Sequence, residues 1–369
     1  MKNERKLASV QKIVDIQPIP GADNIEVVSV KGWKCVSKKG EFSIGDSCVY
    51  FEVDSFLPIV DEFEFLRGSS FRKMKDDTEG FRLKTIKLRK QISQGLCLTI
   101  HEMYKLYLKL HESKDPYHWA HWFEGMDLTS MLKVRKYEIE IPAQLAGTVK
   151  GGFPAFIRKT DEERVQNLPE IFTERKNEIF YATEKLDGTS STFYMRDSEF
   201  GVCSRNLDLA RPELFVSGME LCDDGIERPK KENTYWKLVR ELHLEDRIKS
   251  LDRNISLQGE MIGEGIQKNK YKLEGQTIKW FNAFDIDKFE YLIFDEFLEI
   301  MDKLQLTTVP IISKNFKLPE TMAELIEMSD GMSLLNKNVR REGIVYRTLG
   351  ENRFSFKVIS NKFLLKHGE

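Results

Sequence analysis

The chain has 369 residues, 41% of them hydrophobic, and carries 57 Lys and Arg against 59 Asp and Glu, for a formal net charge of −2. This length allows two domains that each bury a core, and the balanced charge argues against a protein that coats nucleic acid without specificity. No run of about 18 apolar residues occurs and the first residues lead into no apolar signal segment, so we expect a cytoplasmic or nuclear protein without a membrane partner.

Short segments that alternate apolar and polar residues fill the first third of the chain. Residues 9–16, 25–30, 46–53 and 81–88 have this period, which is typical of strands, and turn residues separate them. Several short strands in succession predict a small closed β-barrel. Within them, residues 18–27 (PIPGADNIEV) resemble the opening of the tRNA-binding OB modules attached to some tRNA synthetases. We therefore expect an N-terminal OB-fold domain over residues 1–130 and a second domain over residues 131–369.

One predicted strand of this first domain is basic. Residues 84–90 (KTIKLRK), which include Lys84 and Lys87, would give this domain a strand with a basic face. Such a face could follow an RNA phosphate backbone. It could equally be an exposed strand face that keeps the protein soluble.

A short polar segment follows the Gly- and Pro-containing connection at residues 142–155. Thr160 and Glu163 form a capping box, which predicts a helix that starts there and carries Arg164 and Gln166 in its first turns. Taken alone, this pattern describes a capped surface helix.

The segment 181–190 (YATEKLDGTS) brings a lysine, an acid and a glycine together after an apolar approach. We interpret Lys185 as a covalent nucleophile, which requires its amine to be neutral although the ordinary lysine pKa is about 10.4. Positive charge nearby would favour the neutral form, and Asp187 could provide it by holding a hydrated metal ion. An ordinary surface turn is the alternative, because Asp-Gly is a common hairpin signal.

Five further segments, each an apolar run interrupted by polar residues, follow this lysine. They are residues 201–206 (GVCSRN), 255–263 (ISLQGEMIG), 280–286 (WFNAFDI), 341–347 (REGIVYR) and 354–360 (FSFKVIS). Together with the lysine segment, and in this order, they resemble the six signature motifs of the covalent nucleotidyltransferases, which are the polynucleotide ligases and mRNA capping enzymes. The resemblance covers roughly residues 181–360.

Within that superfamily the chain looks like an ATP-dependent RNA ligase with an N-terminal OB-fold domain. Relatives among the DNA ligases and capping enzymes carry an OB domain after the last motif, whereas few residues follow Lys357 here. The segment 160–167 also looks like the one that precedes the nucleophile in that RNA ligase group. The resemblance implies an α+β fold, in which a small β-barrel precedes an antiparallel-sheet, ATP-grasp-like nucleotidyltransferase domain.

The resemblance also implies roles in catalysis. Lys185 would attack the α-phosphorus of ATP and hold AMP through a phosphoramidate. Lys357 would meet the α-phosphate, and Asp187 and Glu342 would hold, through water, the Mg²⁺ or Mn²⁺ that lowers the pKa of Lys185. The AMP would pass to an RNA 5′-phosphate, and an RNA 3′-hydroxyl would then displace it.

The remaining implied roles concern binding. Glu260 would accept a hydrogen bond from the AMP ribose, Phe281 would stack on adenine, and Glu184 would contribute backbone contacts to the adenine edge. Arg205 would orient phosphates or the 3′-hydroxyl end. Arg164 and Gln166 are weaker candidates for contacts to RNA or phosphate, together with Lys84 and Lys87.

One motif departs from the pattern of the relatives. Many of them have two lysines separated by one residue in the last motif, but Ser355 stands at the first position, so Lys362, Lys366 or the metal ions would have to supply the missing charge. We expect a monomer that acts on RNA with 3′-hydroxyl and 5′-phosphate ends. The alternatives are a DNA or hybrid-duplex ligase, a capping-type guanylyltransferase, and an inactive RNA-binding relative.

Overall fold

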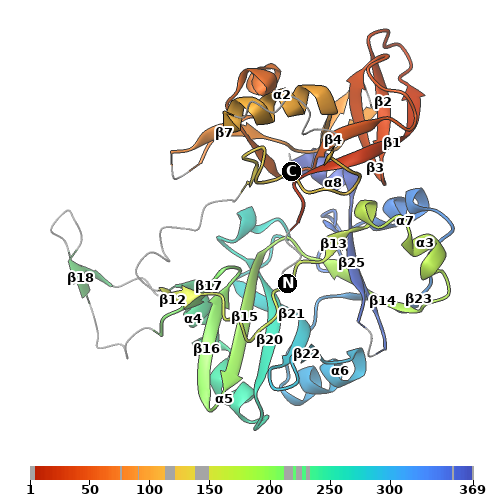
Figure 1. The fold of residues 1–369 in the computed structure, drawn as a ribbon. Helices are drawn as coiled ribbons and strands as arrows, with labels where there is room; N and C mark the ends of the chain where they lie inside the picture. The colour runs from red at the N-terminus through yellow and green to blue at the C-terminus, as the bar shows by residue number, and fades with distance from the viewer. Residues whose placement is uncertain are drawn as a thin grey trace.

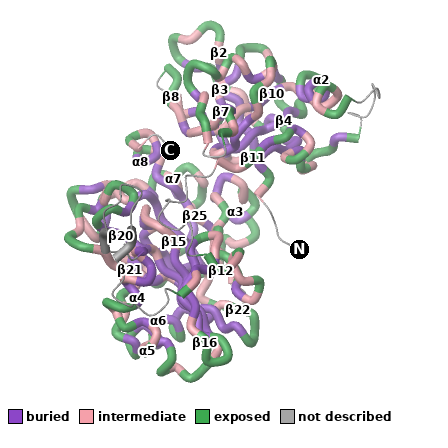
Figure 2. The backbone as a smooth tube through the Cα atoms, turned by 90° about the vertical axis from the view of Figure 1, so that its left-hand side faces the viewer, coloured by how far each residue is buried: buried purple, intermediate pink, exposed green. Residues whose placement is uncertain are grey.

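The computed structural model describes residues 5–74, 77–89, 91–112, 121–137, 149–211, 219–221, 227–229, 233–350 and 353–367. An N-terminal domain lies above a larger domain, and each is built on two main sheets (Figure 1). Buried residues are concentrated in these sheets (Figure 2). The expected α+β fold, an OB-fold barrel followed by a domain of largely antiparallel sheets, is confirmed.

The OB-fold is a five-stranded antiparallel sheet with the strand order β10-β4-β1-β2-β3. Its strands are β1 (Ala8–Pro18), β2 (Ile25–Val30), β3 (Trp33–Lys38), β4 (Ser47–Phe51) and β10 (Leu96–Thr99). The first half of β1 pairs with β4 and its second half with β2. The two edges of the sheet approach each other, because the Gln94 N–H, just before β10, donates to the Lys34 carbonyl at 2.8 Å. Helix α2 (Ile100–His111) follows, and Thr99 and Glu102 cap its start.

A second sheet of the N-terminal domain has the order β11-β5-β7-β6. Its strands are β5 (Ser55–Pro58), β6 (Phe71–Lys73), β7 (Glu79–Arg82) and β11 (Arg135–Lys136). The helices η1 (Asp61–Leu66) and α1 (Arg67–Ser70) connect β5 to β6. The single strand expected over residues 81–88 is wrong, because β7 ends at Arg82 and β8 (Ile86–Leu88) forms a separate hairpin with β9 (Gln91–Ser93). Two consecutive strands had the same alternating pattern.

The larger domain contains two sheets. The seven-stranded sheet has the order β12-β17-β16-β15-β20-β21-β22, and its strands are β12 (Val149–Gly152), β15 (Thr189–Arg196), β16 (Glu199–Ser204), β17 (Leu207–Leu209), β20 (Ile255–Gly263), β21 (Gln276–Asp285) and β22 (Glu290–Tyr291). The five-stranded sheet has the order β13-β25-β24-β14-β23, and its strands are β13 (Glu163–Arg164), β14 (Phe180–Lys185), β23 (Ile311–Phe316), β24 (Gly343–Thr348) and β25 (Ser355–Ile359). A small hairpin joins β18 (Met219–Leu221) and β19 (Glu227–Pro229).

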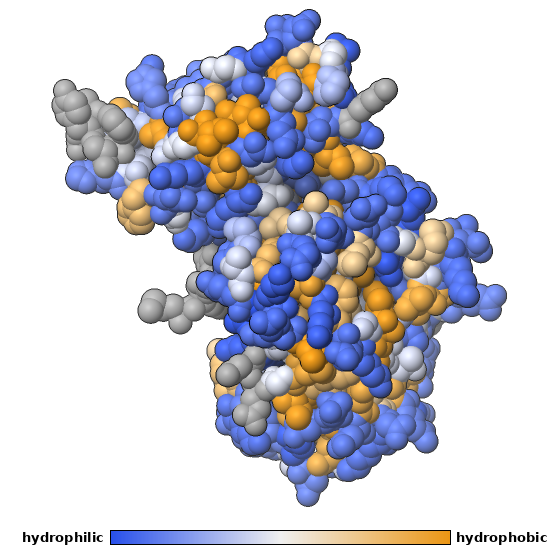
Figure 3. All heavy atoms as spheres, turned by 90° about the vertical axis from the view of Figure 1, so that its right-hand side faces the viewer, coloured by the Kyte–Doolittle hydropathy of each residue, from blue (hydrophilic) through white to orange (hydrophobic). Residues whose placement is uncertain are grey.

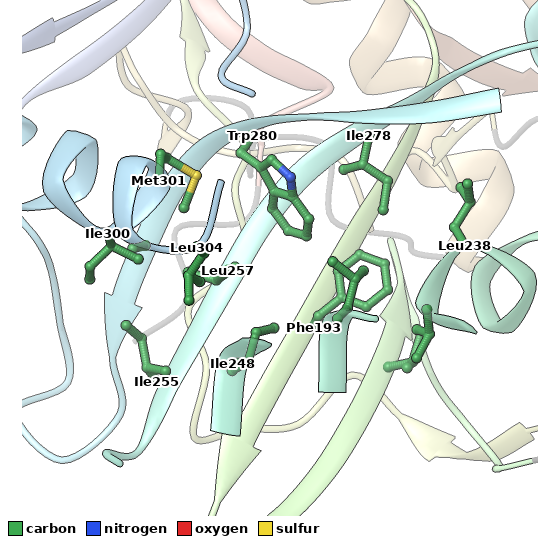
Figure 4. Packing of buried hydrophobic residues seen from close by; sticks show 14 of the residues in the cluster. Phe193, Leu238, Ile248, Ile255, Leu257, Ile278, Trp280, Ile300, Met301 and Leu304 are labelled. Carbon is green, nitrogen blue, oxygen red and sulfur yellow. The ribbon is translucent and has the colours of Figure 1, made fainter. Parts of the chain in front are cut away.

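Helices cover one face of the seven-stranded sheet and stabilise it by burying apolar side chains. They are α4 (Thr234–Glu241), α5 (Leu244–Lys249) and α6 (Phe294–Lys303). Phe193 and Trp280 from the sheet pack with Leu238, Ile248 and Met301 from these helices (Figure 4). Each such side chain contributes roughly 1.5–3 kcal/mol when it is fully buried.

The five-stranded sheet is covered by a second set of helices. They are η4 (Val165–Asn167), α3 (Ile171–Glu174) and α7 (Met322–Ser329), and α8 (Asn361–His367) follows β25 at the end of the described chain. On the face shown in Figure 3, hydrophilic side chains predominate and apolar groups are exposed on both domains. None of the helices within the described residues is long and apolar enough to cross a membrane.

The helix expected to start at Thr160 is wrong. Glu163 and Arg164 form β13, which pairs in parallel with Phe356 and Lys357 of β25, and only the short helix η4 follows. The capping box is a local signal, and pairing with a strand almost 200 residues further along the chain overrides it.

The two domains meet at this β13–η4 segment. The Gly32 N–H of the OB-fold donates to the Gln166 carbonyl at 2.8 Å, and the Trp33 indole N–H donates to the Asn167 side chain. A Cβ atom on Gly32 would lie 2.8 Å from the Gln166 Cα, so the close approach requires glycine. The junction therefore fixes the OB-fold against the strand pair that carries Lys357.

Candidate active site

A cavity of about 700 Å³ lies where the two sheets of the larger domain meet the N-terminal domain. Lys185 ends β14 of the five-stranded sheet and Thr189 begins β15 of the seven-stranded sheet, so the turn between them joins the two walls. Arg5, Asp54 and Arg82 line the cavity from the N-terminal domain. The size lies in the usual range for small-molecule sites.

Lys185 is held as an ammonium ion by its acidic neighbours. Its Nζ lies 2.6 Å from both carboxylate oxygens of Glu342. Burial opposes the charged form, but the carboxylates of Glu342, Glu260 and Asp187 outweigh burial and raise the Lys185 pKa above its ordinary value. The amine becomes a nucleophile only when positive charge offsets these carboxylates.

Asp187 follows two residues later and also faces a lysine. Its backbone N–H donates to the Tyr271 hydroxyl at 2.8 Å, and its carboxylate forms an ion pair with Lys270. It is the buried carboxylate oxygen Oδ2 that contacts the Lys270 ammonium group. Gly188 is required at the turn, because a Cβ there would lie 2.2 Å from the Met261 carbonyl oxygen.

Glu260 adds a third acid to this end of the cavity. It lies on β20, and its Oε1 accepts a hydrogen bond from the Gly188 N–H at 3.1 Å. Burial, reinforced by the negative charges of Glu342 and Asp187 and opposed by Lys185, raises the Glu260 pKa to about 8. Three carboxyl groups therefore surround Lys185 at this end of the cavity.

The residues at this end fit a hydrated divalent cation. Within the described residues, no group of three or more His, Cys, Asp or Glu side chains forms an all-protein metal site. Asp187 and Glu342 nevertheless line the same cavity, and Mg²⁺ is usually bound by one or two carboxylates, water and substrate phosphates. The buried Asp187 carboxylate, which pairs with Lys270, is an acceptor that such a hydrated ion could use.

Another part of the cavity is its basic end. Asp161 lies 3.3 Å from Lys357, 3.7 Å from Arg205 and 3.8 Å from Lys136. Burial lowers the Lys357 pKa, and Asp161 only partly offsets this effect. Although burial opposes it, these cations hold the Asp161 pKa well below its usual range. Cations that converge on one carboxylate form a site suited to phosphate.

A third part of the cavity is suited to a flat ring. Phe281 packs with Leu186 and Val309, and the Arg347 guanidinium carbon lies 5.7 Å from its ring centroid. Glu184 is buried nearby, and its Oε2 accepts a hydrogen bond from the Leu334 N–H at 2.7 Å. Burial raises the Glu184 pKa.

Arg347 lies next to Ser355, which stands where many relatives have a lysine. It lies opposite Ser355 in the β24–β25 pair and lines the cavity. Its guanidinium donates to Glu162 at 2.9 Å and to Thr183 at 3.1 Å. Lys362 instead forms an ion pair with Asp330, and neither Lys362 nor Lys366 lines the described cavity. The cation next to Ser355 therefore comes from the neighbouring strand.

The structure brings most of the predicted site residues into one cavity. They are Arg164, Glu184, Lys185, Asp187, Arg205, Glu260, Phe281, Glu342 and Lys357. Gln166 is 1% exposed at the domain junction, Lys84 is half-buried before β8, and Lys87 is exposed on β8, so these three lie outside the described cavity. Sequence reasoning missed Lys136, Asp161, Lys270 and Arg347, whose positions carry no periodic signal.

Comparisons with known proteins cover both domains. A model described as an OB-fold domain matches residues 7–100, and a model described as RNA ligase matches residues 178–359. No curated protein sequence gives a significant match.

Solved structures of Naegleria gruberi RNA ligase match the whole chain. The structure with PPi is 39% identical, covers 99% of this chain and 99% of that chain, and has a TM-score of 0.85. A variant with ATP and Mn is 39% identical, with 98% and 99% coverage and a TM-score of 0.84. A variant with AMP and Mn is 39% identical, with 99% coverage of each chain and a TM-score of 0.85.

Proposed function

The chain belongs to the RNA ligase family and is an ATP-dependent RNA ligase, and from this premise we propose that it joins RNA 3′-hydroxyl and 5′-phosphate ends through a lysyl-AMP intermediate on Lys185. The observation that carries the proposal is the position of the Lys185 Nζ. It contacts Glu342 at an acidic end suited to a cation, in a cavity that also has a basic end suited to phosphate and is large enough for a nucleotide.

In the first step, Lys185 attacks the α-phosphorus of ATP. The ammonium group must first lose a proton, and an N–P bond then forms while the bond to the departing pyrophosphate breaks. Asp187 and Glu342 would hold Mg²⁺ or Mn²⁺ through water, and the ion would supply positive charge that lowers the Lys185 pKa. Lys357 and Arg205 bind the phosphates from the opposite side.

The nucleoside occupies the remaining part of the cavity. Phe281 stacks on adenine, and the backbone beside the buried Glu184 contacts the adenine edge. Glu260 accepts a hydrogen bond from a ribose hydroxyl through a carboxyl oxygen. Arg347 supports this arrangement, because its guanidinium lies next to Phe281 and is fixed by Glu162 and Thr183.

Two transfers complete the reaction. An oxygen of the RNA 5′-phosphate attacks the phosphorus of lysyl-AMP, the N–P bond breaks, and the lysine recovers a proton. An RNA 3′-hydroxyl then attacks the 5′-phosphorus of the adenylylated RNA, AMP leaves, and the hydroxyl proton is released. RNA repair or nick sealing is the role that we propose for this activity.

We also propose how the chain divides this work. The OB-fold domain, residues 1–130, binds RNA through exposed basic groups such as Lys84 and Lys87, and residues 131–369 carry out adenylyl transfer. Arg164 is 11% exposed and lies 3.7 Å from Asp54 at the cavity, where it can contact phosphate. Gln166 acts at the domain junction through its carbonyl group. We propose a monomer in the cytoplasm or nucleus.

Labelling with nucleotide tests the central claim. The protein is incubated with α-labelled ATP or GTP and Mg²⁺ or Mn²⁺, and a denaturing gel compares it with Lys185→Ala. We expect label from ATP that survives denaturation and is absent in the variant. Label only from GTP would indicate capping chemistry, and no label would indicate an RNA-binding relative. Joining assays with RNA, DNA and hybrid ends then separate RNA ligation from DNA ligation.

A further inference from the structure

A second, smaller cavity opens beside the basic end of the active site. It has a volume of about 160 Å³ and is lined by Lys136, Phe153, Lys159, Thr160, Asp161, Ser190, Thr192, Arg205 and Asn206. We call it the side cavity. Phe153, Lys159 and Thr192 line only the side cavity, whereas its other lining residues also line the active-site cavity. The two cavities are therefore continuous, but a few residues distinguish them.

The groups around the side cavity suit an anion. Lys136, Lys159 and Arg205 face a single acid, Asp161, so the lining carries two more positive than negative charges. Ser190 and Thr192 lie two residues apart on β15 and so present their hydroxyls on the same face of the strand. Lysine, arginine and hydroxyl groups are the usual donors to phosphate oxygens.

Lys159 is held in place at the rim. Its Nζ lies 3.1 Å from the Asn206 side-chain oxygen and 5.4 Å from the centroid of the Phe153 ring. The amide oxygen and the ring face both attract an ammonium ion. These contacts hold the charge of an exposed lysine beside the cavity.

The proposed reaction requires an RNA phosphate site beside the AMP phosphate. An oxygen of the RNA 5′-phosphate must approach the phosphorus bound to Lys185, so the RNA phosphate has to bind next to the AMP phosphate. The side cavity adjoins the active-site cavity through Arg205, Asp161 and Ser190. A cavity of about 150 Å³ holds a single six-membered ring, so this one suits a phosphate with part of a ribose, not a second nucleotide.

We propose that the side cavity binds the 5′-terminal phosphate of the RNA substrate, and that Lys159 and Thr192 contact it outside the ATP site. This inference rests on the proposed function, because it assigns a place to the substrate of the second step. Since Lys159 does not line the active-site cavity, its loss should slow transfer of AMP to RNA and spare the formation of lysyl-AMP.

The test compares Lys159→Ala and Lys159→Arg with Lys288→Ala. The control side chain, Lys288, is 68% exposed in the same domain and lines neither cavity. Three quantities are measured: the rate of lysyl-AMP formation, the single-turnover rate of AMP transfer from purified lysyl-AMP enzyme to 5′-phosphorylated RNA, and the affinities for that RNA and for the same RNA with a 5′-hydroxyl.

For Lys159→Ala we expect transfer to slow about tenfold or more, because a charge-assisted hydrogen bond is lost, and lysyl-AMP formation to stay within about twofold. The preference for 5′-phosphorylated over 5′-hydroxyl RNA should disappear, and Lys159→Arg should recover most of both properties. Normal transfer in Lys159→Ala would overturn the inference. An equal loss of affinity for both RNAs would also overturn it, because it would indicate an internal phosphodiester contact. If the unmodified protein forms no lysyl-AMP, the proposed function fails, and the binding comparison still decides the side cavity.

Discussion

Two partly buried lysines in one cavity have opposite acid–base properties. Lys185, at the acidic end, faces Glu342, Glu260 and Asp187, and its pKa is raised. Lys357, at the basic end, faces one carboxylate, that of Asp161, and its pKa is lowered by burial and by the positive charges of Lys185 and Arg164. Burial acts in the same direction on both lysines, so their neighbours decide the outcome.

This contrast separates two tasks that a single lysine could not perform well. As the proposed nucleophile, Lys185 must lose its proton during the reaction, and its raised pKa would keep it unreactive until a cation binds. A phosphate ligand must stay charged, and Lys357 has Asp161 at 3.3 Å as a partner until phosphate arrives. The fold would therefore keep Lys185 unreactive before the cation binds and keep Lys357 available to bind phosphate.

We expect the largest effect on lysyl-AMP formation from substituting Glu342, whose carboxylate contacts Lys185. Glu342→Gln takes away a ligand of the proposed cation, so we expect lysyl-AMP formation to slow about 1000-fold at neutral pH. The pKa of Lys185 should fall at the same time, because a carboxylate that raises it is gone. Since the neutral amine reacts, the rise of the residual activity with pH should shift to lower pH.

A pH series of single-turnover labelling measures both effects. Glu290→Gln serves as the control, because Glu290 lies on β22 outside the cavity. A rate close to that of the unmodified protein would show that Glu342 neither holds the cation nor governs Lys185.

Removing the lysine of the basic end should have a smaller effect. Lys357→Met keeps most of the side-chain volume but loses the charge, and Arg205 and Lys136 remain beside Asp161. We expect lysyl-AMP formation to slow about 100-fold, mainly through the maximal rate, because the charge on the α-phosphate is greatest in the transition state. Rates measured over a range of ATP concentrations separate the maximal rate from the ATP concentration that gives half of this rate. A change in the ATP requirement alone would mean that Lys357 only binds the ground state.

The sequence predicted the residues of the acidic end better than those of the basic end. Lys185, Asp187, Glu260 and Glu342 came from motifs that the chain shares with a known family, and the structure places all four in one cavity. At the basic end, only Lys357 and Arg205 carried such a signal. Their shared partner Asp161 lies in a segment whose capping box predicted a helix, and its role appears only when β13 pairs with β25.

The same reason explains the other differences between sequence and structure. The OB-fold was predictable because its strands are short, alternating and consecutive, so local pattern and fold agree. Lys136 reaches the cavity and Lys270 reaches Asp187 from segments without a period, and Arg347 acts through its position opposite Ser355. Such contacts depend on which strands become neighbours, and a single sequence does not state this.

A third prediction tests the role of Asp161 in the charge of Lys357. Asp161 raises the Lys357 pKa, so Asp161→Asn should lower it further. Because the charged form of Lys357 binds phosphate, the alkaline decline in lysyl-AMP formation should begin at lower pH. We expect a shift of about one pH unit or less, because the Asp161 side chain is 47% exposed and solvent screens its charge. A pH profile with exposed Asp302→Asn as the control checks this, and a shift to higher pH would contradict it.

The smallest effect on catalysis is expected at the domain junction. Asn167→Ala removes the acceptor of the Trp33 indole N–H and leaves that buried donor unpaired, which should lower the free energy of unfolding by about 1–3 kcal/mol. Urea denaturation measures this loss against Asn315→Ala, an exposed control on β23. This substitution leaves the charges around Lys185 and Lys357 unchanged. The rate of lysyl-AMP formation should therefore rise and fall at the same pH values as in the unmodified protein. A shifted alkaline limit would mean that the junction acts on Lys357 through Arg164, whose guanidinium lies over the Trp33 ring and whose charge lowers the Lys357 pKa. In that case the contrast between the two lysines would depend on the N-terminal domain as well as on their neighbours in the cavity.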